Sequence, residues 1–98
     1  MIKVIKSGST IKIGGHANYS EAGTDIVCAS VSSIILTIVN SIMNIDSNSI
    51  EYIDDGNTVI INKLNDNSTV DILLNTMIDL LKDLSKQYKN NIKIESED

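Results

Sequence analysis

Residues 14–32 read GGHANYSEAGTDIVCASVS and decide how the chain folds around its reactive side chains. They contain the only histidine of the chain, His16, and its only cysteine, Cys28. The two glycines end a strand pattern, and Asp25 stands before a long uncharged helical pattern. Because aspartate in that place is typical of a helix N-cap, we expect a helix from about Ile26, with Cys28 at its third position.

Cys28 and His16 have the chemical types and surroundings of a nucleophile and its base. The first turn of a helix carries unpaired backbone N–H groups and the positive end of the helix dipole, so it favours a thiolate over a thiol. An imidazole on a glycine-flanked loop can accept the thiol proton, as in cysteine nucleophile pairs. The residues alone leave open a second interpretation, in which Cys28 is an inert buried residue and His16 is structural.

The segment between these two residues has the composition of a surface loop. Residues 17–24 carry no hydrophobic period, Gly14 and Gly15 lie before them, and Gly23 lies near their end. Because glycine adopts backbone conformations closed to other residues, we predict loop hinges at these three positions. The loop is then either a lid or a plain connection, and a lid without apolar anchors should be mobile in the free protein.

Two polar residues are candidates for supporting the pair. Asp25 could orient His16 as the third member of a triad, or it could only cap the helix, which we favour slightly because a capping carboxylate is already occupied. Ser32 lies one helical turn after Cys28 and shares its face. Its hydroxyl could hydrogen-bond within the site or bond back to the Cys28 carbonyl, and the sequence leaves both roles open.

Composition and charge indicate one small soluble domain over residues 1–98. Of the 98 residues, 42% are hydrophobic, which suffices for a modest core, and the net charge of −5 argues against binding nucleic acid. The single cysteine excludes an internal disulfide and fits the reducing cytoplasm, and the opening strand pattern predicts no signal peptide. One histidine and one cysteine are too few for a zinc site, so we predict no metal and no cofactor.

Residues 26–45 contain no charged side chain, so a membrane span has to be weighed. Polar residues recur every three or four positions, at Ser30, Ser33, Thr37, Asn40, Ser41 and Asn44. The opposite face carries Val27, Val31, Ile34, Ile35, Ile38, Ile42 and Ile45. This pattern predicts an amphipathic helix buried against a core rather than a helix facing lipid, and therefore no membrane partner.

Hydrophobic periodicity predicts the order β-β-α-β-β-α-β. The strands are expected at residues 1–6, 10–14, 50–54, 58–64 and 91–95, and the helices at about 26–44 and 69–89. The apolar face of the second helix comprises Val70, Leu73, Leu74, Met77, Leu80, Leu81 and Leu84. At its start, Ser68 and Asp71 resemble a capping box. The order predicts an α+β fold, a two-layer α/β sandwich with both helices on one face of a mixed five-stranded sheet.

The opening stretch also resembles the signature of a known family. The matching residues are Gly15-His16-Ala17, Gly23, Asp25-Ile26-Val27-Cys28-Ala29 and Val31-Ser32. They are similar to the motif of the ribosomal-processing cysteine protease family of bacteria. The resemblance implies an endopeptidase that removes a short N-terminal extension from large-subunit ribosomal protein L-twenty-seven, with His16 and Cys28 at the family's catalytic positions. It also implies a ribosomal protein precursor as partner and a homodimer.

In that interpretation the Cys28 thiolate attacks a peptide carbonyl, and His16 takes the thiol proton and later protonates the leaving amine. We expect backbone N–H groups at the helix start to stabilise the oxyanion. The alternative function is a non-catalytic module that docks a ribosomal protein, with Cys28 merely buried. A reachable thiolate distinguishes the two functions, because an enzyme needs one and a docking module does not.

Overall fold

The computed structural model describes residues 1–21 and 25–97 of the chain. Within these ranges, the strands and helices follow the predicted order. Their bounds are β1 (Ile2–Ser7), β2 (Thr10–Gly14), α1 (Ile26–Ile45), β3 (Ile50–Asp54), β4 (Thr58–Lys63), α2 (Ser68–Gln87) and β5 (Ile92–Glu97). Every predicted element is present, and the largest differences between predicted and observed ends occur in α2 and β5.

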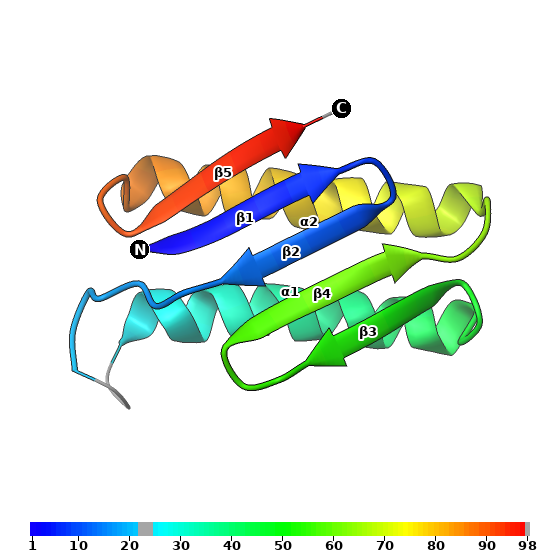
Figure 1. The fold of residues 1–98 in the computed structure, drawn as a ribbon, viewed down its shortest axis with the longest axis horizontal. Coiled ribbons are helices and arrows are strands. Elements are labelled where there is room, and N and C mark those ends of the chain that lie inside the picture. Colours follow the sequence, from blue (N-terminus) through cyan, green and yellow to red (C-terminus); the bar gives the residue numbers. More distant parts are fainter. Residues whose placement is uncertain (22–24, 98) are drawn as a thin grey trace.

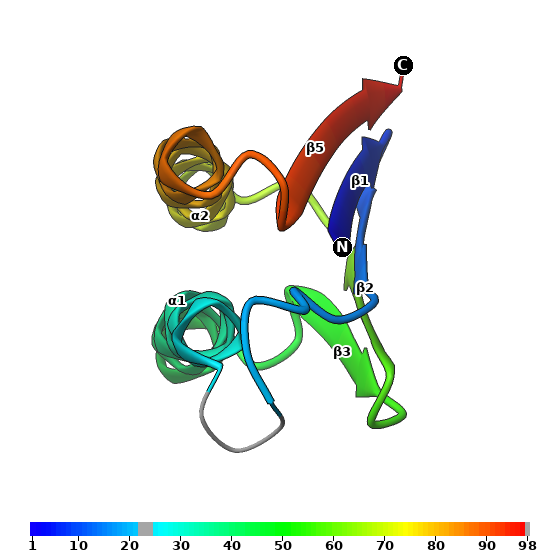
Figure 2. The same cartoon turned by 90° about the vertical axis from the view of Figure 1, so that its left-hand side faces the viewer.

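The strands form one mixed sheet in the order β3-β4-β2-β1-β5 (Figure 1). The pairs β1–β2, β2–β4 and β3–β4 are antiparallel, whereas β1 and β5 run parallel. Both helices lie on the same face of this sheet (Figure 2). The predicted two-layer sandwich is therefore confirmed. Because β5 adds to β1, the residues just before β5 lie beside the start of the chain.

The core lies between the sheet and the two helices. Successive side chains of a strand point to opposite faces of the sheet, so alternate residues enter the core. Across β2 and β4, for example, Ile11 lies opposite Ile61. The buried strand residues are Ile2, Val4, Ile11, Ile13, Ile50, Ile61 and Ile92. β-Branched side chains thus supply most of the strand contribution to the core, which fits their preference for pleated surfaces.

α1 packs one face into the core. Its buried residues are Val27, Val31, Ile35, Ile38, Val39 and Ile42. The prediction of this face was wrong for Ile45, which is 50% exposed at the last helical position, and it missed Val39. The buried residues recur with the helical period and form one stripe, and the helix contacts both α2 and the sheet.

Among the described residues, α1 is the one helix long and apolar enough to cross a membrane, judged by length and composition alone. In this structure it covers the sheet beside α2 (Figure 2). Three hydroxyls on it donate to the carbonyl four residues earlier, from Ser30, Thr37 and Ser41. These hydrogen bonds give the three hydroxyls a partner within the helix. The absence of a membrane partner stays a prediction.

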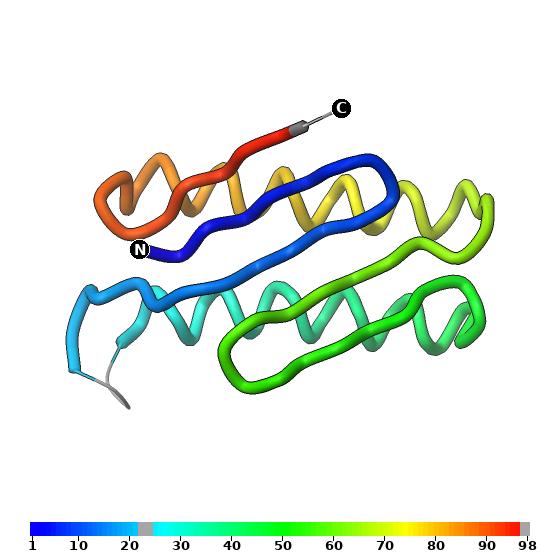
Figure 3. The backbone as a smooth tube through the Cα atoms, viewed as in Figure 1, coloured from blue at the N-terminus to red at the C-terminus, as the bar shows by residue number. Residues whose placement is uncertain are grey.

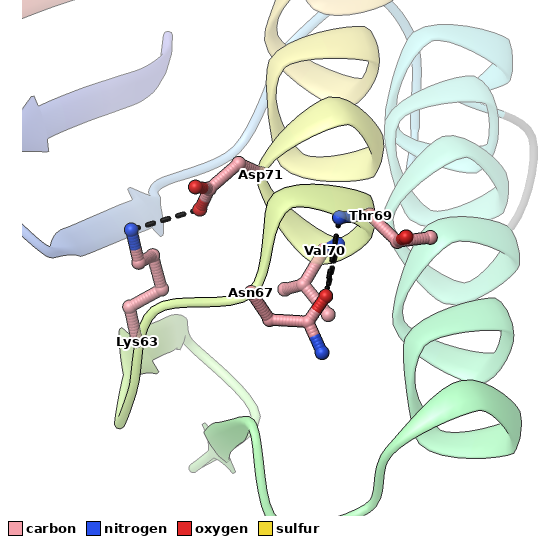
Figure 4. A network of polar contacts seen from close by, with 5 residues as sticks. All are labelled: Lys63, Asn67, Thr69, Val70 and Asp71. Atoms are coloured by element: carbon pink, nitrogen blue, oxygen red, sulfur yellow. Dashed lines mark hydrogen bonds and ion pairs between the residues drawn. The ribbon is translucent and has the colours of Figure 1, made fainter.

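α2 is capped by Asn67, so the prediction of Ser68 as its cap was wrong (Figure 4). Asn67 Oδ1 accepts hydrogen bonds from the N–H groups of the second and third helical residues, at 3.1 and 3.2 Å. The acid expected to complete a capping box, Asp71, instead pairs with Lys63 of β4 at 2.8 Å. This ion pair uses the carboxylate that a capping box would need.

The buried face of α2 differs from the predicted one at four positions, since Leu73 and Leu84 are only partly buried, Leu80 is exposed and Ile78 is buried. Its buried residues are Val70, Leu74, Met77, Ile78 and Leu81. Leu80, predicted to be buried, is 43% exposed, whereas Ile78 is only 7% exposed. α2 contacts both α1 and β5, and Ile78 belongs to the core and lies beside Ile94 of β5 in the wall of a surface pocket.

Four segments that are distant in sequence meet at one end of the molecule. Figure 3 shows the N-terminus, the loop that follows β2, the start of α1 and the α2–β5 connection at the same end of the sheet. Hydrogen bonds confirm this arrangement, since Asn91 bonds to both Ile2 and Ala17. The fold therefore brings the conspicuous stretch of the sequence next to residues from the C-terminal part of the chain.

Candidate active site

The chain leaves β2 through a glycine that no other residue can easily replace. Gly15 has a φ of +88°, and a Cβ built on it would lie 2.5 Å from the Met1 carbonyl oxygen. Gly14, in contrast, still belongs to β2 and pairs in register with Lys3 and Thr58. Of the predicted hinges, Gly15 thus has the special backbone conformation, Gly14 lies in the strand, and Gly23 lies outside the described residues. A hinge function for them stays a prediction.

Ala17, the residue after His16, is held by hydrogen bonds at both its N–H and its carbonyl, and its side chain is buried. Its N–H donates to Cys28 Sγ at 3.3 Å, and its carbonyl accepts a hydrogen bond from Asn91 Nδ2 at 2.8 Å. Its side chain is 1% exposed. The loop that carries His16 is therefore joined directly to the cysteine sulfur and to the C-terminal part of the fold.

Asp25 caps α1, as predicted, and also holds the loop. Its Oδ1 accepts the N–H groups of Val27 and Cys28, both at 3.0 Å. Its Oδ2 accepts those of Tyr19 at 3.0 Å and Ser20 at 3.4 Å. Burial raises the pKa of the Asp25 carboxyl, but these backbone donors outweigh it and hold the pKa below its ordinary value of 3.8. Capping, extended to the loop, accounts for both oxygens of this carboxylate.

The expectation that the loop lacks apolar anchors was wrong for residues 17–20. Tyr19 contacts Tyr88 edge to face, with ring centroids 5.3 Å apart and an interplanar angle of 86°. Ala17 is buried, and Asp25 bonds two loop amides. The pattern of polar residues concealed these contacts, because their partners lie at the start of α1 and after α2. The last three residues of the predicted lid, 22–24, lie outside the described part of the chain.

Cys28 is the third residue of α1, as predicted, and it is half-buried. Its sulfur accepts the Ala17 N–H, and a hydrogen bond of this kind stabilises negative charge on sulfur. The N–H groups at the helix start, which we expected to stabilise the oxyanion, are in part occupied. The N–H groups of Val27 and Cys28 already donate to Asp25, so the helix start does not offer these two to a substrate oxygen.

His16 and Cys28 line the same cavity, which has a volume of about 210 Å³. His16 is exposed at its mouth, and Ser32 lines it from the next turn of α1. Asp25 is not part of the lining. The opposite wall comes from the β3–β4 hairpin, with Asp54 and Asn57 among its residues. The structure thus brings His16, Cys28 and Ser32 to one cavity, while Asp25 is joined to it through the N–H of Cys28.

Sequence reasoning missed the contributions of the hairpin wall and of Asn91. The hairpin itself is evident from Asp55-Gly56-Asn57, but its place beside His16 depends on the pairing of β2 with β4. No local signal marks Asn91, which lies 74 positions from its partner Ala17. Within residues 1–21 and 25–97, no group of three or more His, Cys, Asp or Glu side chains is arranged to hold a metal ion.

Comparison with known proteins identifies the family. Residues 1–93 match the family model described as cysteine protease Prp. The chain belongs to the cysteine protease Prp family. A Prp relative, the ribosomal processing cysteine protease Prp of Staphylococcus aureus, is 34% identical over 83 residues, which cover 82% of this chain and 78% of the relative.

Solved Prp structures share the fold over almost the whole chain. A crystal structure of the essential ribosomal processing protease Prp from S. aureus, in complex with a covalently linked product peptide, has a TM-score of 0.90 and 29% identity. A second, in complex with a substrate peptide, has a TM-score of 0.86 and 27% identity. Each covers 99% of this chain and 100% of the other. The family resemblance of the sequence motif, the fold and the class of cysteine protease are thereby confirmed.

Proposed function

We propose that this chain is an endopeptidase that removes the short N-terminal extension of the precursor of ribosomal protein L-twenty-seven, with Cys28 as nucleophile and His16 as general base. The observation that carries the proposal is the cavity that His16 and Cys28 line together. Cys28 is the only cysteine of the chain, and a cysteine protease needs a thiolate nucleophile. The peptides bound to the S. aureus relatives support a peptide substrate here.

The reaction divides into acylation and deacylation. His16 removes the proton from Cys28 Sγ, the sulfur bonds to the scissile carbonyl carbon, and the carbonyl π pair moves to oxygen. When this intermediate collapses, the C–N bond breaks and the amine leaves with the proton from His16, so a thioester remains on Cys28. Water then gives a proton to His16 and attacks the thioester, and the sulfur leaves with that proton returned to it.

The oxyanion of the intermediate needs a hydrogen-bond donor close to sulfur. Asp25 already holds two N–H groups of the helix start. The Ala17 N–H lies 3.3 Å from Cys28 Sγ, so it can stabilise the thiolate before attack and the neighbouring oxygen afterwards. We therefore assign the oxyanion donor to the His16 loop rather than to the start of α1.

Asp25 and Ser32 support the reaction without reacting. The Asp25 carboxylate accepts N–H groups from both the start of α1 and the loop, and so keeps the segment that carries His16 close to the one that carries Cys28. Ser32 is exposed in the cavity wall, where its hydroxyl can hydrogen-bond the backbone of a bound peptide. The single cysteine and the family resemblance also support a cytoplasmic homodimer, which we include in the proposal.

Mass spectrometry of the precursor after incubation with variants tests this function. Cys28→Ala should abolish cleavage and retain calorimetric binding, because alanine is well tolerated in a helix and only the covalent step is lost. His16→Ala should also stop turnover but leave the thiol able to react with iodoacetamide. Ser33→Ala, on the exposed side of the same helix, is the matched control and should cleave like the wild type.

The outcomes separate the enzyme from the docking module. Unchanged cleavage by Cys28→Ala would overturn the assignment of the nucleophile. Binding of the precursor by the wild type without any cleavage would favour the docking module. L-twenty-seven that already lacks its extension is the substrate control, and it should stay intact with every variant.

A further inference from the structure

We propose that Asn91, in the connection between α2 and β5, is a positioning residue for the catalytic pair, an inference that rests on the proposed function. Its Nδ2 donates to the Ala17 carbonyl at 2.8 Å. Ala17 directly follows His16, and its N–H donates to Cys28 Sγ. Asn91 therefore acts on both catalytic residues through the one small residue that joins them.

The backbone of Asn91 is itself anchored to the sheet. Its carbonyl accepts the Ile2 N–H at 2.8 Å, and its N–H donates to the Tyr88 carbonyl at 2.9 Å. The next residue, Ile92, starts β5 and pairs in register with Ile2. A side chain on such an anchored backbone restricts the position of its partner more than a side chain on an unsupported loop does.

The Ala17–Asn18 peptide is where this constraint acts. Asn18 has a φ of 56°, in the left-handed region, which asparagine adopts more readily than other residues that carry a Cβ. The carbonyl of this peptide is the one that Asn91 holds. Without the Asn91 donor, the Ala17 backbone loses one of its two hydrogen bonds, so the Ala17 Cα and its N–H can shift relative to Cys28 Sγ.

The same connection contacts the loop a second time. The Tyr88 ring meets that of Tyr19 edge to face, two residues beyond Ala17. Tyr19 is 49% exposed, so this second contact lies at the surface, whereas the bond from Asn91 to Ala17 is partly buried. Together, Tyr88 and Asn91 contact Tyr19 and Ala17, which Asp25 and Cys28 also hold through hydrogen bonds.

A merely structural role for Asn91 would predict a different experimental result. If its amide only satisfied a carbonyl, its loss would lower stability and leave the turnover of folded enzyme unchanged. Positioning predicts that kcat falls while KM stays near the wild-type value. The reason is that much of the cavity wall comes from α1 and the β3–β4 hairpin, and the residues that line it do not include Asn91.

The test compares two substitutions that introduce the same charge. Asn91→Asp replaces the amide donor by an acceptor of nearly the same size, and Asn90→Asp places that charge on the exposed neighbour. We expect the kcat for precursor cleavage to fall roughly tenfold to a hundredfold in Asn91→Asp, the range for slight misplacement of catalytic groups, and to stay unchanged in Asn90→Asp. Asn91→Gln, which keeps the amide, should recover part of the kcat. Thermal melts confirm that each variant is folded.

The rate of Cys28 alkylation by iodoacetamide separates failure of this inference from failure of the proposed function. It should be lower in Asn91→Asp than in Asn90→Asp even if the wild type cleaves no precursor. That result would overturn the protease and retain the positioning role. Folded Asn91→Asp with the kcat and alkylation rate of Asn90→Asp would overturn the positioning role. Asn91→Ala, which removes the donor without adding charge, gives the same comparison if Asn91→Asp does not fold.

Discussion

Gly15 offers a stability test with a matched control inside the same chain. Gly15 has a φ of +88° and Gly56 a φ of +90°, so alanine suffers the same backbone strain at either position. They differ in their surroundings. A Cβ on Gly15 meets the Met1 carbonyl oxygen at 2.5 Å, whereas a Cβ on Gly56 meets nothing within 4 Å. Comparing the two alanine variants therefore isolates the cost of the close approach to Met1.

The expected magnitudes follow from these two terms. A left-handed conformation costs a residue other than glycine about 1–2 kcal/mol, and both variants share this term. Overpacking in Gly15→Ala should add about 1–3 kcal/mol. Movement of Met1 cannot relieve the contact cheaply, because the next residue, Ile2, is 4% exposed and its N–H is bonded to the Asn91 carbonyl. We expect the larger loss of stability in Gly15→Ala.

Urea unfolding of the wild type and both variants measures the difference, provided that their m-values agree. In a domain of this size, each additional 1 kcal/mol should lower Tm by roughly 4–8 °C, so thermal melts give an independent check. Equal destabilisation of Gly15→Ala and Gly56→Ala would refute the reasoning, because it would mean that the Met1 carbonyl does not restrict position 15.

Two further predictions concern pH. The pKa of Asp25 is lowered in the folded state, so its stabilising effect is complete above the ordinary value of 3.8 and is lost as the pH falls through the folded value. The stability difference between wild type and Asp25→Asn, measured by urea unfolding, should thus be larger at about pH 6 than at about pH 3, and a constant difference would contradict the assignment. The hydrogen bond from Lys63 to Asp71 raises the pKa of Lys63 above 10.5, so its stabilising effect is complete below that value and is lost as the pH rises through the raised one. Lys63→Gln should accordingly lower Tm at about pH 8, and the difference should shrink at about pH 11.

Local rules predicted the parts of this site that depend on local chemistry. An aspartate before an amphipathic pattern fixes the start of α1, and counting from it places Cys28 in the first turn. Alternating isoleucine and lysine fixes β2, and thereby the strand end from which His16 projects. The element order then limits the fold to a few arrangements, of which the two-layer sandwich is the one observed.

The predictions were wrong where two neighbouring residues were equally suited to the same position. Asn67 and Ser68 are both good N-caps, and in the structure Asn67 caps the helix while Asp71, the acid of the predicted capping box, pairs with Lys63 of β4. Leu80 and Ile78 are both apolar, and the sites of α1 and β5 around α2 decide which is buried. Such decisions depend on tertiary contacts that periodicity does not contain.

The oxyanion donor illustrates the same limit in the chemistry. A helix start offers a few unpaired N–H groups, and the same groups can bind either a capping carboxylate or a substrate anion, but not both. From the sequence, we predicted that Asp25 caps the helix and that the N–H groups of the same helix start stabilise the oxyanion. In the structure Asp25 takes the N–H groups of Val27 and Cys28, and Ala17 supplies the N–H at the sulfur. In the mechanism that we propose, the Ala17 N–H also serves the oxyanion, so the loop has to be held in place, and both Asp25 and Asn91 hold it through hydrogen bonds to its backbone.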